Sequence, residues 1–144
     1  MLGGKTPLPG SNFALLDTSV YIENFRSGRF TEALIRSPWI IRCSAVVLHE
    51  LRRGTRTVLE RRFVADLAKK VRIITPTERH WVESAEVLSL MGRKRGYDPH
   101  KLRELAFDVL IALSVRATGA TLITCNHQDF AEIRKYKPFK ALYW

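Results

Sequence analysis

The sequence has few cysteines, no long hydrophobic run and no secretion signal. Its two cysteines, Cys43 and Cys125, are too few for a disulfide framework and lack the close pairing of a metal site. No apolar stretch reaches the roughly 20 residues that a membrane-spanning helix needs. The N-terminus lacks the apolar segment of a signal peptide. These absences favour a protein of the reducing cytoplasm with no membrane anchor.

Acidic residues are also scarce. The 144 residues include 24 Lys and Arg but only 14 Asp and Glu, which gives a net charge of +10. A charge of this size indicates an anionic partner such as nucleic acid, an acidic protein or a membrane surface. The length suits one compact domain, and the apolar content of 46% suffices for a core. We expect a flexible leader over residues 1–12 and a single domain over residues 13–144.

Short apolar runs alternate with segments of helical spacing. The runs predict strands at 13–16, 39–43, 71–74 and 121–124, with a possible edge strand at 140–143. Cap residues and glycines predict helices from Thr18 or Ser19 to Gly28, and over 30–37, 44–54, 57–70, 77–91, 98–118 and 129–135. This alternation is typical of an α/β domain whose central, mainly parallel sheet is flanked by helices.

Four carboxylates stand in unusual apolar surroundings. Asp17 ends the buried run FALL, Glu50 lies in the apolar helix SAVVLHELRRG, Asp108 interrupts LAFDVLIALSV, and Asp129 follows the strand TLIT. Taken singly, each has a structural explanation. Asp17 can be a helix cap or turn residue, and Asp108 and Glu50 can pair with arginines. Taken together, they are expected at the carboxyl end of the sheet, where open α/β sheets bind ligands.

Clustered carboxylates repel one another unless a cation neutralises them. Oxygen ligands of this kind suit Mg²⁺ or Mn²⁺. Two such metals can assist phosphodiester cleavage by forming the attacking hydroxide and stabilising the leaving oxygen. A basic surface would at the same time hold the phosphates of the substrate. The pattern therefore predicts a metal-dependent nuclease.

The same motifs resemble the PIN-domain family, and especially the VapC-type toxins of bacterial and archaeal toxin–antitoxin pairs. The matching pieces are LDTSVYI, SAVVLHELRRG and FDVLIALSVRATGATLITCNHQDF, which together span about residues 13–133. The resemblance implies a PIN-like three-layer sandwich that cleaves RNA with one or two Mg²⁺ or Mn²⁺ ions. It assigns the metal and the catalysis to Asp17, Glu50, Asp108 and Asp129, with Thr18 or Ser19, Thr124 and Asn126 as supporting polar groups.

The resemblance also implies partners. VapC-like proteins usually form homodimers and are inhibited by an antitoxin whose tail enters the acidic groove. The RNA substrate is expected to contact the arginines nearest Glu50 in the sequence, which are Arg52, Arg53 and Arg56. The basic run Arg93–Arg95 matches no motif of the family, and it is interpreted as a solvated surface face rather than as an RNA contact, which is the alternative.

Other functions remain open on the sequence alone. A dehalogenase-like phosphatase needs a second aspartate two residues after the first, where this chain has Ser19. A receiver domain needs a lysine after a late strand, where this chain has Asn126. A PIN-like RNA-processing nuclease that is no toxin, and a silent RNA-binding or regulatory module, keep the same fold. The four acids argue against a silent module, because carboxylates do not help to bind phosphate.

Overall fold

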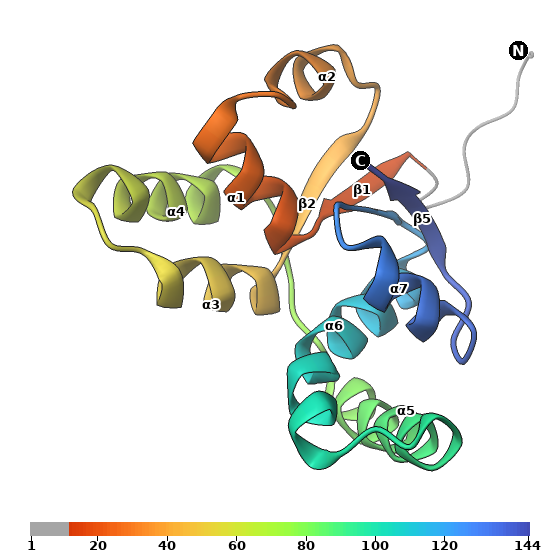
Figure 1. The fold of residues 1–144 in the computed structure, drawn as a ribbon. Helices are drawn as coiled ribbons and strands as arrows, with labels where there is room; N and C mark the ends of the chain where they lie inside the picture. The colour runs from red at the N-terminus through yellow and green to blue at the C-terminus, as the bar shows by residue number, and fades with distance from the viewer. Residues whose placement is uncertain (1–11) are drawn as a thin grey trace, which may run out of the picture.

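The computed structural model describes residues 12–144 (Figure 1), so the predicted leader lies outside the described residues except for Asn12. The elements follow one another as β1 (Phe13–Leu16), α1 (Thr18–Ser27), α2 (Thr31–Arg36), β2 (Ile40–Ser44), α3 (Ala45–Gly54), α4 (Val58–Lys70), β3 (Ile73–Ile74), α5 (Glu78–Arg95), α6 (Pro99–Thr118), β4 (Thr121–Thr124), α7 (His127–Arg134) and β5 (Lys140–Tyr143). None of the helices in this described part is both long enough and apolar enough to cross a lipid bilayer.

The five strands form one sheet in the order β3-β2-β1-β4-β5, and every pair is parallel. The predicted α/β sandwich with a central parallel sheet is therefore confirmed. Leu15, Leu122 and Ile123 in the two middle strands are at most 1% exposed, as expected of a sheet covered by helices on both faces. The possible edge strand at 140–143 is β5, which pairs with β4.

The helix boundaries follow the cap residues. Thr57 and Thr77 form capping boxes at the starts of α4 and α5, and the Asp98 side chain caps α6 ahead of Pro99. The predicted cap of the first helix is wrong, because Asp17 occupies that position and Thr18 is already helical. Helix α5 runs past the predicted end at residue 91 to Arg95, because Gly92 keeps a helical conformation and the left-handed residue that ends the helix is Gly96.

The chain order of the strands reverses its direction at β1. From β1 the chain adds β2 and then β3 on one side, and it later adds β4 and β5 on the other side of β1. The carboxyl ends of β1 and β4 therefore flank a topological switch point, where such sheets open a crevice for ligands. Helices α1, α3 and α7 begin directly after β1, β2 and β4, so that their first turns lie at this end of the sheet (Figure 1).

Candidate active site

Asp17 lies at the carboxyl end of β1 and is only 4% exposed. Although it occupies the N-cap position of α1, its side chain makes no capping hydrogen bond. Its Oδ2 instead accepts hydrogen bonds from Ser19 Oγ at 2.7 Å and from Thr124 Oγ1 at 2.9 Å. The helix-cap explanation of this carboxylate is therefore insufficient, because the side chain points toward the neighbouring strand β4.

The two hydroxyl groups that hold Asp17 are themselves fixed. Ser19 Oγ accepts a hydrogen bond from the backbone N–H of Cys125 at 3.1 Å, and Thr124 Oγ1 accepts one from the backbone N–H of Asn126 at 2.9 Å. Each hydroxyl proton is consequently directed at the Asp17 carboxylate, since the backbone donor occupies an acceptor site on the same oxygen. This network links the end of β1 to the end of β4.

Glu50 projects from α3 toward the start of α1. Its Oε1 accepts a hydrogen bond from Thr18 Oγ1 at 2.7 Å, which brings Glu50 next to the residue that follows Asp17. Burial raises the pKa of the Glu50 carboxyl, the Thr18 hydrogen bond opposes that rise, and the charge of Asp17 adds to it. The two adjacent hydroxyl residues therefore have different partners: Thr18 donates to Glu50, and Ser19 donates to Asp17.

Asp129 lies in the first turn of α7, with Asn126 at the cap. The backbone N–H of Asp129 donates to Asn126 Oδ1 at 3.3 Å, and Asn126 Nδ2 donates to Asp129 Oδ2 at 3.2 Å. The remaining carboxylate oxygen, Oδ1, accepts a hydrogen bond from Lys101 Nζ at 3.3 Å. Asn126 thus both starts the helix and orients the acid.

Asp108 lies in the middle of α6, between the apolar residues Phe107 and Val109. Burial, together with the charges of Asp17, Glu50 and Asp129, raises the pKa of Asp108 to about 8, and the charge of Lys101 opposes this rise. The structure therefore brings all four predicted acids together from four elements at one edge of the sheet. We call this group, Asp17, Glu50, Asp108 and Asp129, the acidic edge.

The chemistry of the acidic edge fits a divalent cation. Four carboxylates share the space, and Lys101 is the one lysine or arginine within ion-pair distance of any of them in the described part of the chain. Within residues 12–144, however, no group of three or more His, Cys, Asp or Glu side chains is already arranged to hold a metal ion. The carboxylates supply the right donor atoms, and the cation would have to draw them closer.

The predicted RNA contacts lie at and just after the end of α3, the helix that carries Glu50. Arg52 and Arg53 form the end of α3, Arg56 follows in the loop, and all three are exposed. None of them makes an ion pair with a carboxylate among the described residues. Arg53 lies 5.9 Å from the ring centre of Phe107, the neighbour of Asp108. These guanidinium groups are available to an anion.

Sequence reasoning missed Lys101 altogether. Its spacing could have identified it: Lys101 precedes Asp108 by seven residues, or nearly two helical turns, so both residues lie on the same face of the helix. Two histidines have other contacts: His49 packs edge-on against Phe107, and the ring of His127 lies tilted against that of Tyr143. Neither cysteine forms a disulfide.

Comparison with known proteins identifies the family. The family model described as the PIN domain matches residues 14–136. No curated protein sequence matches the chain.

Solved structures share the fold. A chain of VapBC2 from Rickettsia felis, bound to a DNA fragment from the promoter, is 20% identical with a TM-score of 0.68 over 92% of this chain and 98% of its own. VapBC-1 from nontypeable Haemophilus influenzae gives 22% identity and a TM-score of 0.66 over the same shares of the two chains. VapBC-5 from Mycobacterium tuberculosis, a member of the VapBC family of toxin–antitoxin systems, gives 21% identity and a TM-score of 0.61 over 92% of this chain and 99% of its own.

The order of the strands, the four acids at the switch point and the family match over most of the chain agree with one another. The predicted resemblance is confirmed, and the chain belongs to the PIN-domain family of nucleases.

Proposed function

We propose that this protein is a metal-dependent endoribonuclease that cleaves RNA phosphodiester bonds at the acidic edge. The observation that carries the proposal is Asp108, a carboxyl in an apolar helix whose pKa is raised by burial and by three other acids. An arrangement that costs stability in the free protein is typical of a functional site. A protein that only bound RNA would gain nothing from it, because carboxylates repel phosphate.

The four carboxylates would hold one or two Mg²⁺ or Mn²⁺ ions. When bound, such a cation lowers the pKa of its water and stabilises the charge that develops on the phosphoryl and leaving oxygens. The remaining side chains orient the ligands. Ser19 and Thr124 fix Asp17, Thr18 fixes Glu50, and Asn126 fixes Asp129, each through the hydrogen bonds described above.

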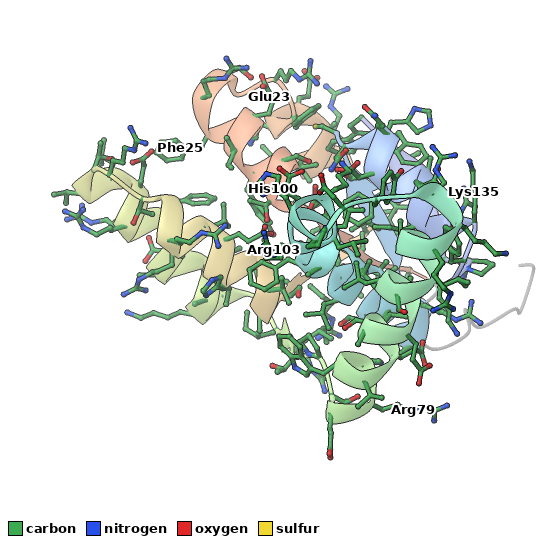
Figure 2. All side chains as sticks on the ribbon, turned by 60° about the horizontal axis from the view of Figure 1, so that its bottom comes forward. Glu23, Phe25, Arg79, His100, Arg103 and Lys135 are labelled. Atoms are coloured by element: carbon green, nitrogen blue, oxygen red, sulfur yellow. The ribbon has the colours of Figure 1, made fainter. Side chains whose placement is uncertain are left out.

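The substrate would be held mainly by charge. The net charge of +10 favours association with the phosphates of RNA, and Arg52, Arg53 and Arg56 lie exposed at and just after the end of the helix that carries Glu50. Arg103, labelled in Figure 2, belongs to the same end of α6 as Lys101 and adds a further positive charge there. Charge of this kind binds without reading the sequence, so the choice of target would come from contacts closer to the acids.

A cleavage assay tests the proposal. Purified protein is incubated with a panel of single-stranded and structured RNAs, first with EDTA and then with added Mg²⁺ or Mn²⁺. We expect no cleavage in EDTA and recovery when the metal is restored. Cleavage that persists in EDTA, and disappears neither on further purification nor in the Asp17→Asn variant, would contradict a metal-dependent reaction at these acids.

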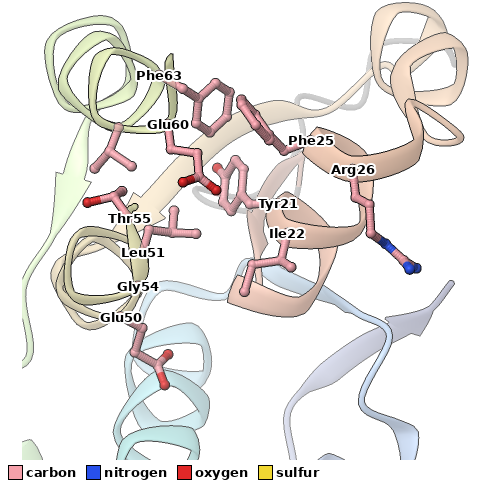
Figure 3. Close-up of a pocket in the computed structure, with 11 residues that line it drawn as sticks. Tyr21, Ile22, Phe25, Arg26, Glu50, Leu51, Gly54, Thr55, Glu60 and Phe63 are labelled. Atoms are coloured by element: carbon pink, nitrogen blue, oxygen red, sulfur yellow. The ribbon is translucent and has the colours of Figure 1, made fainter. Parts of the chain in front are cut away.

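We further propose that the nuclease is the toxin of a type II toxin–antitoxin pair. The fold is that of chains from solved VapBC toxin–antitoxin complexes. A pocket of about 510 Å³ between α1, α3 and α4 also supports this role, because it is lined by Tyr21, Phe25, Leu51, Phe63 and Val64, and Glu50 lies at its border (Figure 3). We call it the apolar pocket. An antitoxin segment with apolar residues would fill it, and a following arginine or lysine would reach Glu50.

The same proposal includes a homodimer in the cytoplasm. Helix α5 exposes two large apolar side chains outside the apolar pocket, Trp81 at 54% and Val82 at 57%. A second copy could cover them, and light scattering of the purified protein measures whether it does. A monomer at micromolar concentration would contradict the dimer.

Expression in a bacterium without any partner separates a toxin from a nuclease that processes RNA. We expect growth to stop, and growth to continue when the Asp17→Asn variant is expressed at the same level. Normal growth with soluble, RNA-cleaving protein would contradict the toxin role and favour RNA processing. A small protein encoded next to this one that restores growth would identify the antitoxin.

A further inference from the structure

Lys101 brings a positive charge to the acidic edge from within the chain. Its Nζ lies 3.3 Å from Asp129 Oδ1, with the two side chains 32% and 27% exposed. It precedes Asp108 on α6 by seven residues, so both side chains project from the same side of the helix. The contact therefore joins the first turn of α6 to the first turn of α7 across the site.

The position of Lys101 is unfavourable for the helix itself. It lies in the first turn of α6, where its backbone N–H donates to the capping side chain of Asp98 at 2.8 Å. The N-terminus of a helix carries a partial positive charge, which disfavours a cation there. Helix stability therefore does not explain a lysine at this position.

An ordinary surface ion pair does not explain it either. The pair of Lys135 and Glu132 on α7 is of that kind, because the lysine is 67% exposed and lies three residues from its partner. Lys101, by contrast, reaches 28 residues along the chain to one of the four acids. Among the described residues, it makes the only ion pair of the acidic edge.

We infer that Lys101 is the internal counter-ion of the acidic edge and competes with a divalent cation for Asp129. This inference rests on the proposed metal-dependent function. The ammonium group and a metal ion need the same carboxylate oxygen, and they repel each other at close range. The site can therefore fill only when the cation displaces Lys101 from Asp129. The lysine thus sets the metal concentration at which the nuclease becomes competent.

Metal binding measured without RNA tests this inference. The probe is Mn²⁺, titrated into the full chain and followed through the electron paramagnetic resonance signal of the free ion. Lys101→Met keeps the apolar stem and removes the charge. We expect it to bind Mn²⁺ roughly threefold to tenfold more tightly than the unaltered protein, because a partly exposed charge at this distance has a modest effect.

Two control variants isolate the cause. Lys101→Arg keeps the charge and should bind Mn²⁺ about as the unaltered protein does. Lys135→Met lowers the total charge equally at a pair outside the acidic edge and should leave the Mn²⁺ affinity unchanged. Circular dichroism and thermal unfolding show whether each variant is folded, and Lys101→Gln replaces Lys101→Met if the latter is not.

The outcomes separate the inference from the proposed function. If the unaltered protein binds Mn²⁺ but Lys101→Met gains no affinity, Lys101 does not compete with the metal and the inference is wrong. Equal gains in Lys101→Met and Lys135→Met also overturn it, since the effect would then be one of total charge. If neither the unaltered protein nor any variant binds Mn²⁺, the metal site itself is wrong, and this inference fails with it.

Discussion

The acidic edge and the apolar pocket lie on the two sides of Glu50 and are built from opposite kinds of residue. At the acidic edge, four carboxylates are gathered around a nearly buried Asp17, and hydroxyl and amide groups orient them. In the apolar pocket, Phe25 remains 48% exposed and Phe63 36% exposed, and their rings meet edge-on at 5.5 Å. The acidic edge therefore holds negative charges that are only partly neutralised, and the apolar pocket holds aromatic side chains that remain partly in contact with water.

The comparison indicates what each region is for. Charge gathered in a half-buried place needs a cation, and hydrophobic side chains left in water need an apolar partner. Because Glu50 belongs to both regions, a partner that filled the pocket would lie next to one of the acids. The following changes test whether the two regions are in fact separate in their effects, beginning with the largest.

Asp17→Asn should have the largest effect, because it should abolish most RNA cleavage and leave the fold intact. The amide keeps the size of the side chain but removes the charge that a metal needs, so we expect RNA cleavage in Mg²⁺ to fall by about 100-fold or more. The midpoint of thermal unfolding should not fall, because the change relieves repulsion among the acids. Asp66→Asn on the exposed surface of α4 is the matched control and should cleave normally. Full activity in a pure, folded Asp17→Asn protein would remove this residue from the site.

Replacing Arg52, Arg53 and Arg56 together by alanine should weaken RNA binding while all four acids stay in place. For single-stranded RNA, each lost phosphate contact lowers the slope of log K against log salt by about 0.7, so we expect a change of roughly 2. The affinity is measured at several salt concentrations with the Asp17→Asn protein, which does not cut. The control replaces the equally basic run Arg93–Arg95 at the end of α5. Equal effects of the two triple variants would mean that the positive charge acts diffusely.

The pH dependence of stability tests the charge of the acidic edge in the metal-free protein. Burial and neighbouring acids raise the pKa of Asp108 to about 8, well above its value in the unfolded chain. Between pH 4 and 8 the folded state therefore binds the proton more tightly, and the free energy of unfolding falls as the pH rises. Asp108→Asn should abolish this part of the dependence, making the variant more stable than the unaltered protein at pH 8 by about 1–3 kcal/mol. Urea unfolding in EDTA at pH 5 and pH 8 measures the difference, and an equal gain at both values would contradict the raised pKa.

Phe63→Ala should affect only the apolar pocket. The ring is partly exposed and contacts Tyr21 and Phe25 by its edge, so we expect a loss of about 1 kcal/mol in the free energy of unfolding. RNA cleavage should stay unchanged. Phe130→Ala is the contrasting case, because Phe130 is 0% exposed and its loss should cost about 3–5 kcal/mol. A large loss of cleavage in Phe63→Ala would show that the pocket and the acidic edge are one unit.

The sequence predicted the elements well where cap residues mark them. Thr57, Thr77 and Asp98 stand at helix starts with strong local signals, and the apolar runs FALL and TLIT allow only a buried strand. The predicted end of α5 at Met91 is too early, because the helix continues through Gly92 and the helix-forming run Arg93–Arg95 to Gly96, whose positive φ ends it.

The site was predictable in part. Acids in apolar segments stand out in a sequence, and the structure brings all four to one edge, although their roles as metal ligands and catalysts remain predictions. The division of labour between Thr18 and Ser19 was not predictable, because it depends on which of two adjacent hydroxyls faces α3 and which faces β4. Lys101 was missed for a similar reason. A lysine near a helix start looks like any solvated residue until the packing of α6 against α7 places Asp129 beside it.

The hydrogen bond from Thr124 to Asp17 has a consequence for the time at which the protein becomes active. It joins residues 107 positions apart, and β1 needs β4 as its neighbour in the sheet. During synthesis, the early part of the chain leaves the ribosome without the strand that completes this edge, because contacts so distant in sequence cannot form before both partners exist. A nascent chain that has not yet reached Asp129 lacks the fourth acid as well. No partly active nuclease would therefore be present during translation. An inhibitor synthesised at the same place would have that whole interval in which to fold.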